Sequence, residues 1–330
     1  MNYKIFQGNV FDCLPKIQSE SVDLVITSPP YWGLREYGVE GQLGAEPSME
    51  AYLDNLMRWV KEVFRVLKPS GSFVLNLGGC YVRPASKGCV PQHKRENPNG
   101  AADGWIQKSN EAFTNLTGIY KEKQFLDVGA FAYARIISET DFVCRNRGTW
   151  CKPNAPSPIR SRLKQSTESI DWFVKNADEY FFNMKPWLKP TTTTTQERCA
   201  YPTNLMEAIR SGKKMQGKKQ LEVITETIEH SWRVVPVGEK QRGFELYGKE
   251  KQEHIAPFPE ALVKPWVESL CPPEGTVLDP FLGSGTVMKI ARDLRLNAVG
   301  IELNPKYVEY AKARVNWNNG LDGNSYEVVA

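Results

Sequence analysis

The chain has 330 residues, enough for one large domain or two modest ones, and 41% of them are apolar, which excludes fibrous and wholly disordered proteins. Its 42 Lys and Arg residues nearly balance 38 Asp and Glu residues, so the net charge of +4 does not by itself indicate a polyanionic partner. Seven irregularly spaced cysteines are typical neither of a zinc site nor of a disulfide framework, and we expect them to be reduced.

The first residues lack the long apolar run of a signal peptide, and no segment is apolar over the roughly 18 residues that a membrane span needs. We therefore expect a soluble, cytoplasmic protein. The N-terminal part predicts strands at 4–6, 22–27 and 72–77, with a helix over about 49–67 between the last two. We expect Lys68-Pro-Ser-Gly71 to end this helix. Strand, helix and strand in this order are typical of a parallel crossover unit.

Two polar segments separate the regular elements. The first, 79–125, has no sustained period and predicts a long surface loop or partly ordered insertion; the second is 185–250. Between them we expect a strand at 142–151 after a helix over 125–140, whose inward residues are Val128, Ala132, Ile136 and Ile137.

The last third is the most regular part of the chain. It predicts alternating helices and strands at 259–269, 276–278, 286–294, 298–301 and 305–315. This alternation is the repeating unit of a doubly wound, mostly parallel α/β sheet, which binds its ligand at the carboxyl ends of the strands.

A glycine-rich turn, Asp279-Pro-Phe-Leu-Gly283-Ser-Gly285-Thr286, lies between a predicted strand and a predicted helix. Its glycines allow the backbone to approach a ligand closely. The third glycine of a dinucleotide fingerprint is missing, so a pyrophosphate is not the expected ligand. Glu302 ends the next strand, where an acidic side chain accepts hydrogen bonds from ribose hydroxyls. Together these residues indicate an adenosine-containing cofactor without a pyrophosphate, whose ammonium group Asp279 is placed to meet. Alternatively, the turn only tightens strand–helix packing.

The segment Thr27-Ser-Pro-Pro-Tyr-Trp32 follows a buried strand. Its prolines cannot continue a sheet and leave carbonyl groups without ladder partners. Such a site suits a planar base with an exocyclic amino group: Ser28 Oγ and the Pro29 carbonyl accept from the amine while Tyr31 stacks on the ring. Alternatively, the prolines merely end the strand, and the two aromatic residues fill the core.

Together the two motifs resemble the S-adenosylmethionine-dependent DNA methyltransferases that methylate amino groups, in the β-class order with the catalytic motif first. The other elements in that order are Gln7-Gly-Asn9, Leu67-Lys-Pro-Ser-Gly-Ser-Phe73, Trp150-Cys-Lys-Pro-Asn-Ala-Pro-Ser-Pro158 and His254-Ile-Ala-Pro-Phe-Pro-Glu-Ala-Leu262. The resemblance implies a Rossmann-like sheet of the seven-stranded methyltransferase type. It also implies a catalytic tetrapeptide of Ser28, Pro29, Pro30 and Tyr31, and cofactor contacts from Asn9, Phe258, Pro259, Asp279, Phe281, Gly283, Gly285, Thr286 and Glu302.

Asn9 is a departure, because the family often has Asp at this place near the adenine; Asp12 is the alternative contact. Ser at the first tetrapeptide position is typical of cytosine-N4 enzymes in the family, whereas Asp or Asn is usual in adenine-N6 enzymes. Methylation at cytosine C5 needs a Cys nucleophile, and no Pro-Cys-Gln segment occurs. Cys271 precedes the cofactor strand, so we interpret it as structural.

Positive charge is concentrated on two segments, as phosphate contact requires. From 142 to 164 the chain has six basic residues and no acidic one, and a second basic cluster lies within 185–250. The candidate DNA contacts are Arg145, Arg147, Lys152, Arg160, Arg162, Lys164, Lys213, Lys214, Lys218 and Lys219. The alternative is a merely solvated charged face.

We therefore expect a DNA methyltransferase that acts on the N4 amine of a flipped-out cytosine, with S-adenosylmethionine as cofactor and without a metal. Its parts would be a catalytic part at 1–184 with the 79–125 insertion, a target-recognition region at 185–250, and a cofactor-binding part at 251–330. Double-stranded DNA is the expected partner; a second copy of the chain and a separate restriction endonuclease are further candidates. The alternatives are an adenine-N6 enzyme, an RNA or protein methyltransferase, and a non-catalytic DNA-binding module.

Overall fold

The computed structural model describes residues 1–33, 39–82, 120–121, 123–152, 165–187, 245–246, 250–251, 259–317 and 323–329. The chain forms two compact units, one of 1–182 with 236–330 and the other of 183–235. In the second unit the description covers 183–187, which includes the 3₁₀ turn η2 (Lys185–Trp187). Most of the predicted recognition region and of the 79–125 insertion lies outside the described residues.

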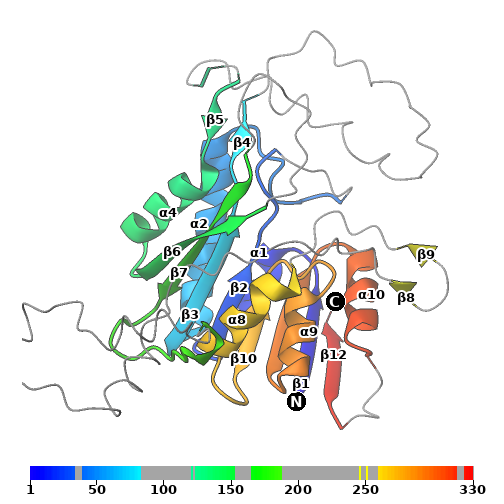
Figure 1. Cartoon of the computed structure of the whole chain (residues 1–330). Coiled ribbons are helices and arrows are strands. Elements are labelled where there is room, and N and C mark those ends of the chain that lie inside the picture. Colours follow the sequence, from blue (N-terminus) through cyan, green and yellow to red (C-terminus); the bar gives the residue numbers. More distant parts are fainter. Residues whose placement is uncertain are drawn as a thin grey trace, which may run out of the picture. The chain divides into compact units, whose positions relative to one another are not determined.

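The first unit is built on an eight-stranded sheet (Figure 1). Its order is β12 (Ser325–Val329), β1 (Asn2–Gln7), β11 (Asn297–Glu302), β10 (Thr276–Asp279), β2 (Val22–Thr27), β3 (Leu67–Leu77), β7 (Thr167–Val174) and β6 (Val143–Cys151). Neighbouring strands from β12 to β3 are parallel, whereas β7 runs antiparallel to both β3 and β6. The predicted mostly parallel α/β sheet is confirmed, with one strand more than the resemblance implies.

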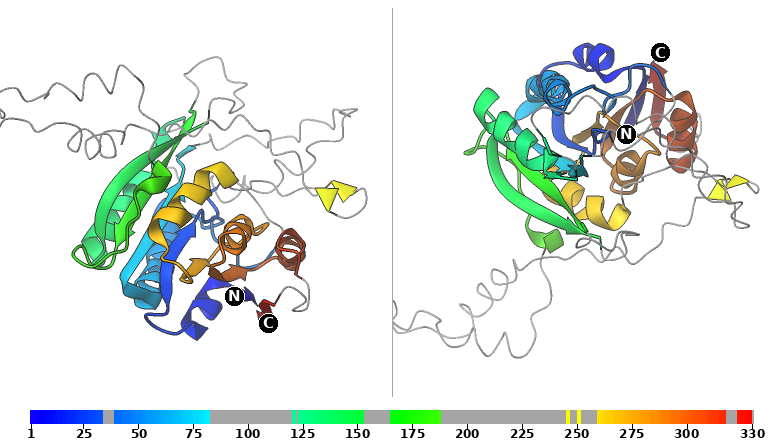
Figure 2. Two further views of the ribbon diagram at one scale, coloured as in Figure 1. Left: turned by 60° about the horizontal axis from the view of Figure 1, so that its bottom comes forward. Right: turned by 90° about the horizontal axis from the view of Figure 1, so that it is seen from above.

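Helices cover both faces of this sheet (Figure 2). One face carries α1 (Val10–Cys13), the 3₁₀ turn η1 (Leu14–Lys16), α2 (Met49–Val66) and α4 (Val128–Glu139). The other carries α8 (Glu260–Leu270), α9 (Thr286–Asp293) and α10 (Pro305–Arg314). Two short ladders complete the description, β4 (Cys80–Tyr81) with β5 (Phe125–Leu126) and β8 (Glu245–Leu246) with β9 (Glu250–Lys251). None of the helices in the described part of the chain is long and apolar enough to span a membrane.

Helix α2 follows directly from its sequence. Ser48 precedes it in an extended conformation, and the Ser48 side chain accepts a hydrogen bond from Ala51 N at 3.1 Å, which caps the first turn. Apolar residues at spacings of three and four turn one face towards the sheet, and Trp59, Val60 and Val63 are fully buried there. This packing holds α2 against β3 and beside α1 and α4.

Several element boundaries differ from the prediction. Strand β3 begins at Leu67, and Lys68-Pro-Ser-Gly71 lies inside it instead of separating helix from strand. The reason is a shift in the β2–β3 register: Val22 pairs with Leu67, but Leu24 pairs with Ser72, so the extra residues form a bulge that tolerates Pro69. In α4, Ile137 is 45% exposed, so its predicted inward position is wrong. Strands β7 and β12 were not predicted.

The position of the site follows from the chain path. From β2 the chain passes through α2 to β3, towards one edge of the sheet. From β10 it passes through α9, on the opposite face, to β11, towards the other edge. The direction of winding therefore reverses between β2 and β10, and doubly wound sheets bind ligands outside the strand ends at this reversal.

Candidate active site

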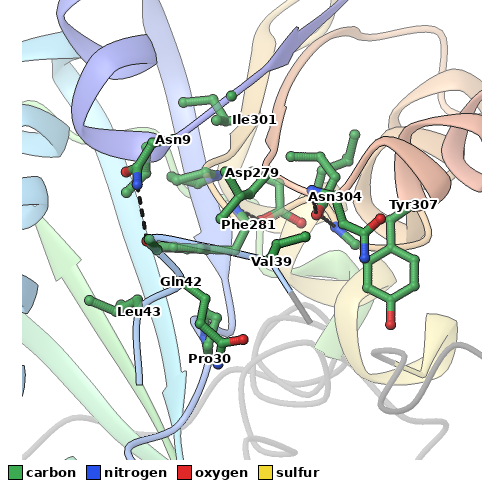
Figure 3. A pocket seen from close by; sticks show the side chains of 18 of the residues that line it. Asn9, Pro30, Val39, Gln42, Leu43, Asp279, Phe281, Ile301, Asn304 and Tyr307 are labelled. Carbon is green, nitrogen blue, oxygen red and sulfur yellow. Dashed lines mark hydrogen bonds between the residues drawn. The ribbon is translucent and has the colours of Figure 1, made fainter. Parts of the chain in front are cut away.

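A pocket opens at the carboxyl ends of β1, β2, β10 and β11 (Figure 3). With its mouth included it contains about 930 Å³ of empty space, part of which is open to solvent. Of the predicted cofactor residues, those that line it are Asn9, Asp279, Phe281, Gly283, Thr286 and Glu302; of the predicted catalytic residues, Ser28 and Pro30 do. Both motifs therefore meet at one pocket, although they lie at opposite ends of the sequence.

The glycine-rich turn places backbone and carboxylates at the pocket wall. Gly283 has a φ of 53°, in the left-handed region that favours glycine, and its N–H donates to Glu302 Oε2 at 2.7 Å. Glu302 Oε1 accepts from Asn304 N at 2.8 Å. A carboxylate has about four lone-pair directions, so Glu302 retains acceptor capacity towards the pocket.

Asp279 ends β10 and joins it to β2. Its Oδ1 accepts from Thr27 Oγ1 at 2.7 Å and from Phe281 N at 3.1 Å. Within the described part of the chain no donor bonds Oδ2. Burial raises the pKa of Asp279 to about 7, and the neighbouring Glu302 adds to the rise. Burial likewise raises the pKa of Glu302 to about 7. Two buried acids in this state favour a ligand with positive charge and hydroxyl donors.

The last two residues of the glycine-rich turn, Gly285 and Thr286, have structural partners. Gly285 does not line the pocket; it has a φ of 80°, and a Cβ there would lie 2.8 Å from Ala311 Cβ in α10. It therefore allows α9 and α10 to pack closely. Thr286 Oγ1 accepts from Arg314 Nη1 at 2.8 Å. Pro259 precedes α8 and does not line the pocket, and Phe258 lies outside the described residues.

Asn9 lies opposite the glycine-rich turn and is fixed at both ends of its amide. Its Oδ1 accepts from Phe11 N at 3.1 Å, and its Nδ2 donates to the Gly41 carbonyl at 3.0 Å, drawing the segment at 39–43 to the pocket (Figure 3). Asp12, the alternative contact, does not line the pocket. Among the lining side chains that sequence reasoning missed are Val39, Gln42, Leu43, Asn304 and Tyr307. Only Asn304 carried a signal, because Asn-Pro is typical of a helix start.

The predicted catalytic tetrapeptide, Ser28 to Tyr31, leaves the sheet at the end of β2. The Pro30 carbonyl accepts from the Tyr52 hydroxyl at 3.1 Å, a side-chain donor that is not part of the sheet ladder. Trp32 is 1% exposed and belongs to the core, as the alternative interpretation held for this residue. Ser28 and Tyr31 are only partly buried.

The Tyr31 hydroxyl is the centre of a polar network beside the tetrapeptide. It lies 2.8 Å from Glu168 Oε2 on β7, 3.0 Å from Asn76 Oδ1 on β3 and 3.2 Å from Ser28 Oγ. Lys152, just after β6, forms an ion pair with the Glu168 carboxylate. Sequence reasoning identified neither Asn76 nor Glu168. Asn76 lies within the predicted strand at 72–77 but carried no signal of a site, and Glu168 lies on β7, which was not predicted.

The predicted DNA contacts on β6 and just beyond it have intramolecular partners. Arg145 donates to the Tyr180 hydroxyl at 3.1 Å, and Arg147 Nε donates to Asp171 Oδ1 at 2.7 Å. Lys152 lies over the Trp150 ring at 3.9 Å in addition to its ion pair. The remaining predicted contacts lie outside the described residues, namely Arg160, Arg162, Lys164, Lys213, Lys214, Lys218 and Lys219.

The fold is the Rossmann-like α/β sheet of methyltransferases, with its pocket at the point where the winding reverses. Residues 22–313 match the N6/N4 methyltransferase family, described as DNA methylase, and the chain belongs to this family. The chain is therefore a DNA methyltransferase of the group that acts on amino nitrogens.

Curated relatives agree with this assignment, and two solved structures share the fold. The chain is 30% identical to the type II methyltransferase M.SmaI of Serratia marcescens over 94% of its own length and 90% of that protein. It is 29% identical to the type II methyltransferase M.XycI of Xanthomonas campestris pv. cyanopsidis, over 96% and 88%. The structure of the cytosine-N4-specific PvuII DNA methyltransferase superposes with a TM-score of 0.57 at 20% identity, covering 99% of this chain and 95% of that one. A protein of Thermus thermophilus assigned as a DNA modification methylase, solved with S-adenosyl-L-methionine, gives 0.53 at 23% identity, covering 99% and 100%.

Proposed function

We propose that this chain transfers a methyl group from S-adenosylmethionine to the exocyclic N4 amine of a cytosine that has left the DNA duplex. The proposal rests chiefly on one observation: Ser28 and Pro30 line the same pocket as Asp279, Gly283 and Glu302. A methyl donor bound by Asp279, Gly283 and Glu302 would therefore lie next to an amine bound at Ser28 and Pro30. This proximity is what a transfer between two bound molecules requires.

The pocket residues fit this cofactor. Glu302, with acceptor capacity beyond its two backbone bonds, would accept from the ribose hydroxyls. Asp279, whose Oδ1 alone bonds described residues, would pair with the ammonium group of the methionine part. Apolar side chains such as Phe281 and Ile301 would enclose the adenine. When bound, the cofactor supplies a methyl group on a positively charged sulfur.

The tetrapeptide would prepare the amine for attack. The lone pair of an amino group on an aromatic ring is delocalised, and acceptors on its hydrogens favour a pyramidal, more nucleophilic nitrogen. Ser28 Oγ and the Pro29 carbonyl would be these acceptors. As the nitrogen bonds the methyl carbon, the carbon–sulfur bond breaks with its electron pair remaining on sulfur. One amine proton then leaves to water, so the product amine is neutral.

The choice of cytosine rests on Ser28, because Ser at this position is typical of the N4 enzymes that the sequence resembles. Adenine N6 is the second candidate, since the same acceptors serve either amine. Extruding either base costs a few kcal/mol, which stacking on the Tyr31 ring would help to offset.

The remaining parts of the chain would hold and read the DNA. We assign 185–250 to target recognition, between a catalytic part at 1–184 and a cofactor-binding part at 251–330, with the basic residues of 142–164 on phosphates. The similarity to type II methyltransferases supports a role in restriction–modification, with the endonuclease on a separate chain.

The test is product analysis with a pair of serine variants. DNA methylated by the protein is digested, and mass spectrometry distinguishes N4-methylcytosine, which we expect, from N6-methyladenine and 5-methylcytosine. Ser28→Ala should slow transfer at least about tenfold, because one acceptor on the amine is lost. Ser21→Ala removes a hydroxyl just before the other end of β2 and should leave the rate unchanged. Finding N6-methyladenine would refute the base assignment, and full activity of Ser28→Ala would refute the mechanism.

A further inference from the structure

We propose that Glu168 is a positioning residue that acts through Tyr31 to turn the lone pairs of Ser28 towards the target amine. This inference rests on the proposed function, because it explains how the Ser28 hydroxyl is kept in the role of acceptor. It gives a role to a carboxylate on β7, the strand that runs antiparallel to β3. No residue of β7 lines the cofactor pocket.

The three residues form a continuous chain of hydrogen bonds. Ser28 Oγ lies 3.2 Å from Tyr31 Oη, and Tyr31 Oη lies 2.8 Å from Glu168 Oε2. Asn76 Oδ1 lies 3.0 Å from the same hydroxyl. The Ser28 link is the longest, as is common for hydrogen bonds in active sites before the substrate binds.

The direction of each bond follows from which groups can donate. A carboxylate oxygen only accepts. Asn76 also presents an acceptor, because its Nδ2 donates to the Ser169 carbonyl at 2.8 Å and this fixes the orientation of its amide. The Tyr31 hydroxyl has a single hydrogen, and the shorter, charge-assisted bond directs it to Glu168. The lone pairs of Tyr31 then accept the Ser28 hydrogen, and the Ser28 lone pairs remain for the amine.

Charge and burial keep this direction fixed. The Glu168 side chain is 14% exposed and forms an ion pair with Lys152, which holds the carboxylate in place beside Tyr31. Burial, with the Glu168 carboxylate adding to it, raises the pKa of Tyr31 well above its usual value, so its hydroxyl keeps the hydrogen that the chain requires. Without the carboxylate, the Tyr31 hydrogen is shared between Asn76 Oδ1 and Ser28 Oγ. Whenever it turns to Ser28, the Ser28 hydrogen points at the amine and opposes its approach.

The experiment is a double-mutant cycle on the methyl-transfer step of the full-length protein. Glu168→Gln replaces the obligate acceptor by an amide that also donates, and Tyr31→Phe removes the relay. We expect Glu168→Gln to lower kcat at least about tenfold, with less than about a twofold change in KM for DNA and in S-adenosylmethionine affinity. In the Tyr31→Phe background the same change should have no further effect, because the path to Ser28 is already broken.

Two controls separate positioning from folding. Glu20→Gln removes another Glu–Lys pair, with Lys175 at the far end of β7, and should leave kcat unchanged. Glu168→Asp keeps a carboxylate and should retain more activity than Glu168→Gln, which provides a measurement if the glutamine variant does not fold. If Glu168→Gln does not fold, Glu168→Asp replaces it in the cycle. A loss of kcat that is equally large with and without the Tyr31 hydroxyl would then assign Glu168 a structural role and overturn the inference.

The outcomes distinguish the inference from the function on which it rests. If the unmodified protein transfers methyl groups and Glu168→Gln does so equally fast, the positioning role is overturned but the proposed function is not. The same holds for a Glu168→Gln defect that is equally large with and without the Tyr31 hydroxyl, since the effect would then not pass through Tyr31. Absence of any transfer by the unmodified protein overturns the proposed function and this inference with it. If the protein methylates adenine instead of cytosine, and the effect of Glu168→Gln disappears in the Tyr31→Phe background as predicted, the inference is still supported.

Discussion

Asp279 and Glu302 are two acids held in an unfavourable environment at the ends of neighbouring strands. Burial raises the pKa of each to about 7, whereas the usual values are 3.8 and 4.5. Near neutral pH the ligand-free pocket therefore retains protons that exposed acids would have lost. A cation that enters the pocket favours the ionised forms, so its binding releases protons.

This linkage predicts the pH dependence of cofactor binding. Between about pH 5 and pH 7 the amino group of S-adenosylmethionine stays protonated, so changes in affinity there report on the protein. Asp279 must ionise to pair with this group, and Glu302 must ionise to accept from both ribose hydroxyls. We therefore expect affinity to rise with pH, by up to about tenfold per pH unit for each acid. Calorimetric titrations at several pH values measure this.

Two aspartate variants serve as a matched pair for this titration. Asp279→Asn should weaken binding at pH 7 and reduce the pH dependence. Asp293→Asn, at the exposed end of α9, should bind like the parent at every pH. An equally steep pH dependence in the Asp279→Asn variant would show that this carboxyl does not meet the cofactor cation.

At the scale of elements, the turn between β10 and α9 depends on close packing against α10. Gly285→Ala places a Cβ 2.8 Å from Ala311 Cβ at a φ of 80°. We expect it to lower the free energy of unfolding by about 1–3 kcal/mol. Gly323→Ala is the control, since Gly323 has a similar φ of 75° but nothing within 4 Å of the added Cβ. Denaturant titration of both variants separates steric overlap from backbone strain, and equal losses would contradict the packing role.

The elements with a single dominant signal could be predicted from the sequence. Strand β2 has the predicted bounds because six successive buried residues precede two prolines, and α2 follows its apolar stripe and Ser48 cap. Strand β7 could not be predicted, because polar residues such as Glu168 occupy its first half and one of its two partner strands, β3, is distant in sequence. Likewise, periodicity alone could not show that Ile137 lies beyond the edge of its buried face.

The same limit applies to the candidate site. Ser28, Asp279 and Glu302 could be placed together, since carboxyl ends of parallel strands share one edge of a sheet. The segment at 39–43 and the carboxylate of Glu168 could not, because their positions depend on tertiary contacts such as the bond from Asn9 to Gly41. Local patterns predict which residues end strands, but not which loops fold back over them.

At the scale of the whole molecule, DNA binding should depend on salt through the basic residues of 142–164. Neutralising Arg160, Arg162 and Lys164 together should weaken binding to all sequences and flatten the dependence of log affinity on log salt, by about 0.9 for each phosphate that the protein no longer neutralises. Fluorescence anisotropy over a salt series measures this slope. The control variant replaces Lys16, Lys61 and Lys312 by Gln. It loses the same number of positive charges, but from elements outside 142–164. Equal slopes for the test variant and the parent would remove these residues from the interface.

The bond between Thr27 and Asp279 joins side chains 252 positions apart, and it has a consequence for how the protein is made. In the sheet, β2 pairs with β10, and β1 pairs with β11 and β12. The two N-terminal strands therefore cannot pair with these C-terminal strands until the last part of the chain has been synthesised. At typical rates of synthesis, the roughly 100 residues between β7 and β10 take about 5–20 seconds to appear. During that time the edge of β2 that later pairs with β10 has no partner strand. We therefore expect the nascent chain to bind chaperones that cover exposed apolar strand edges.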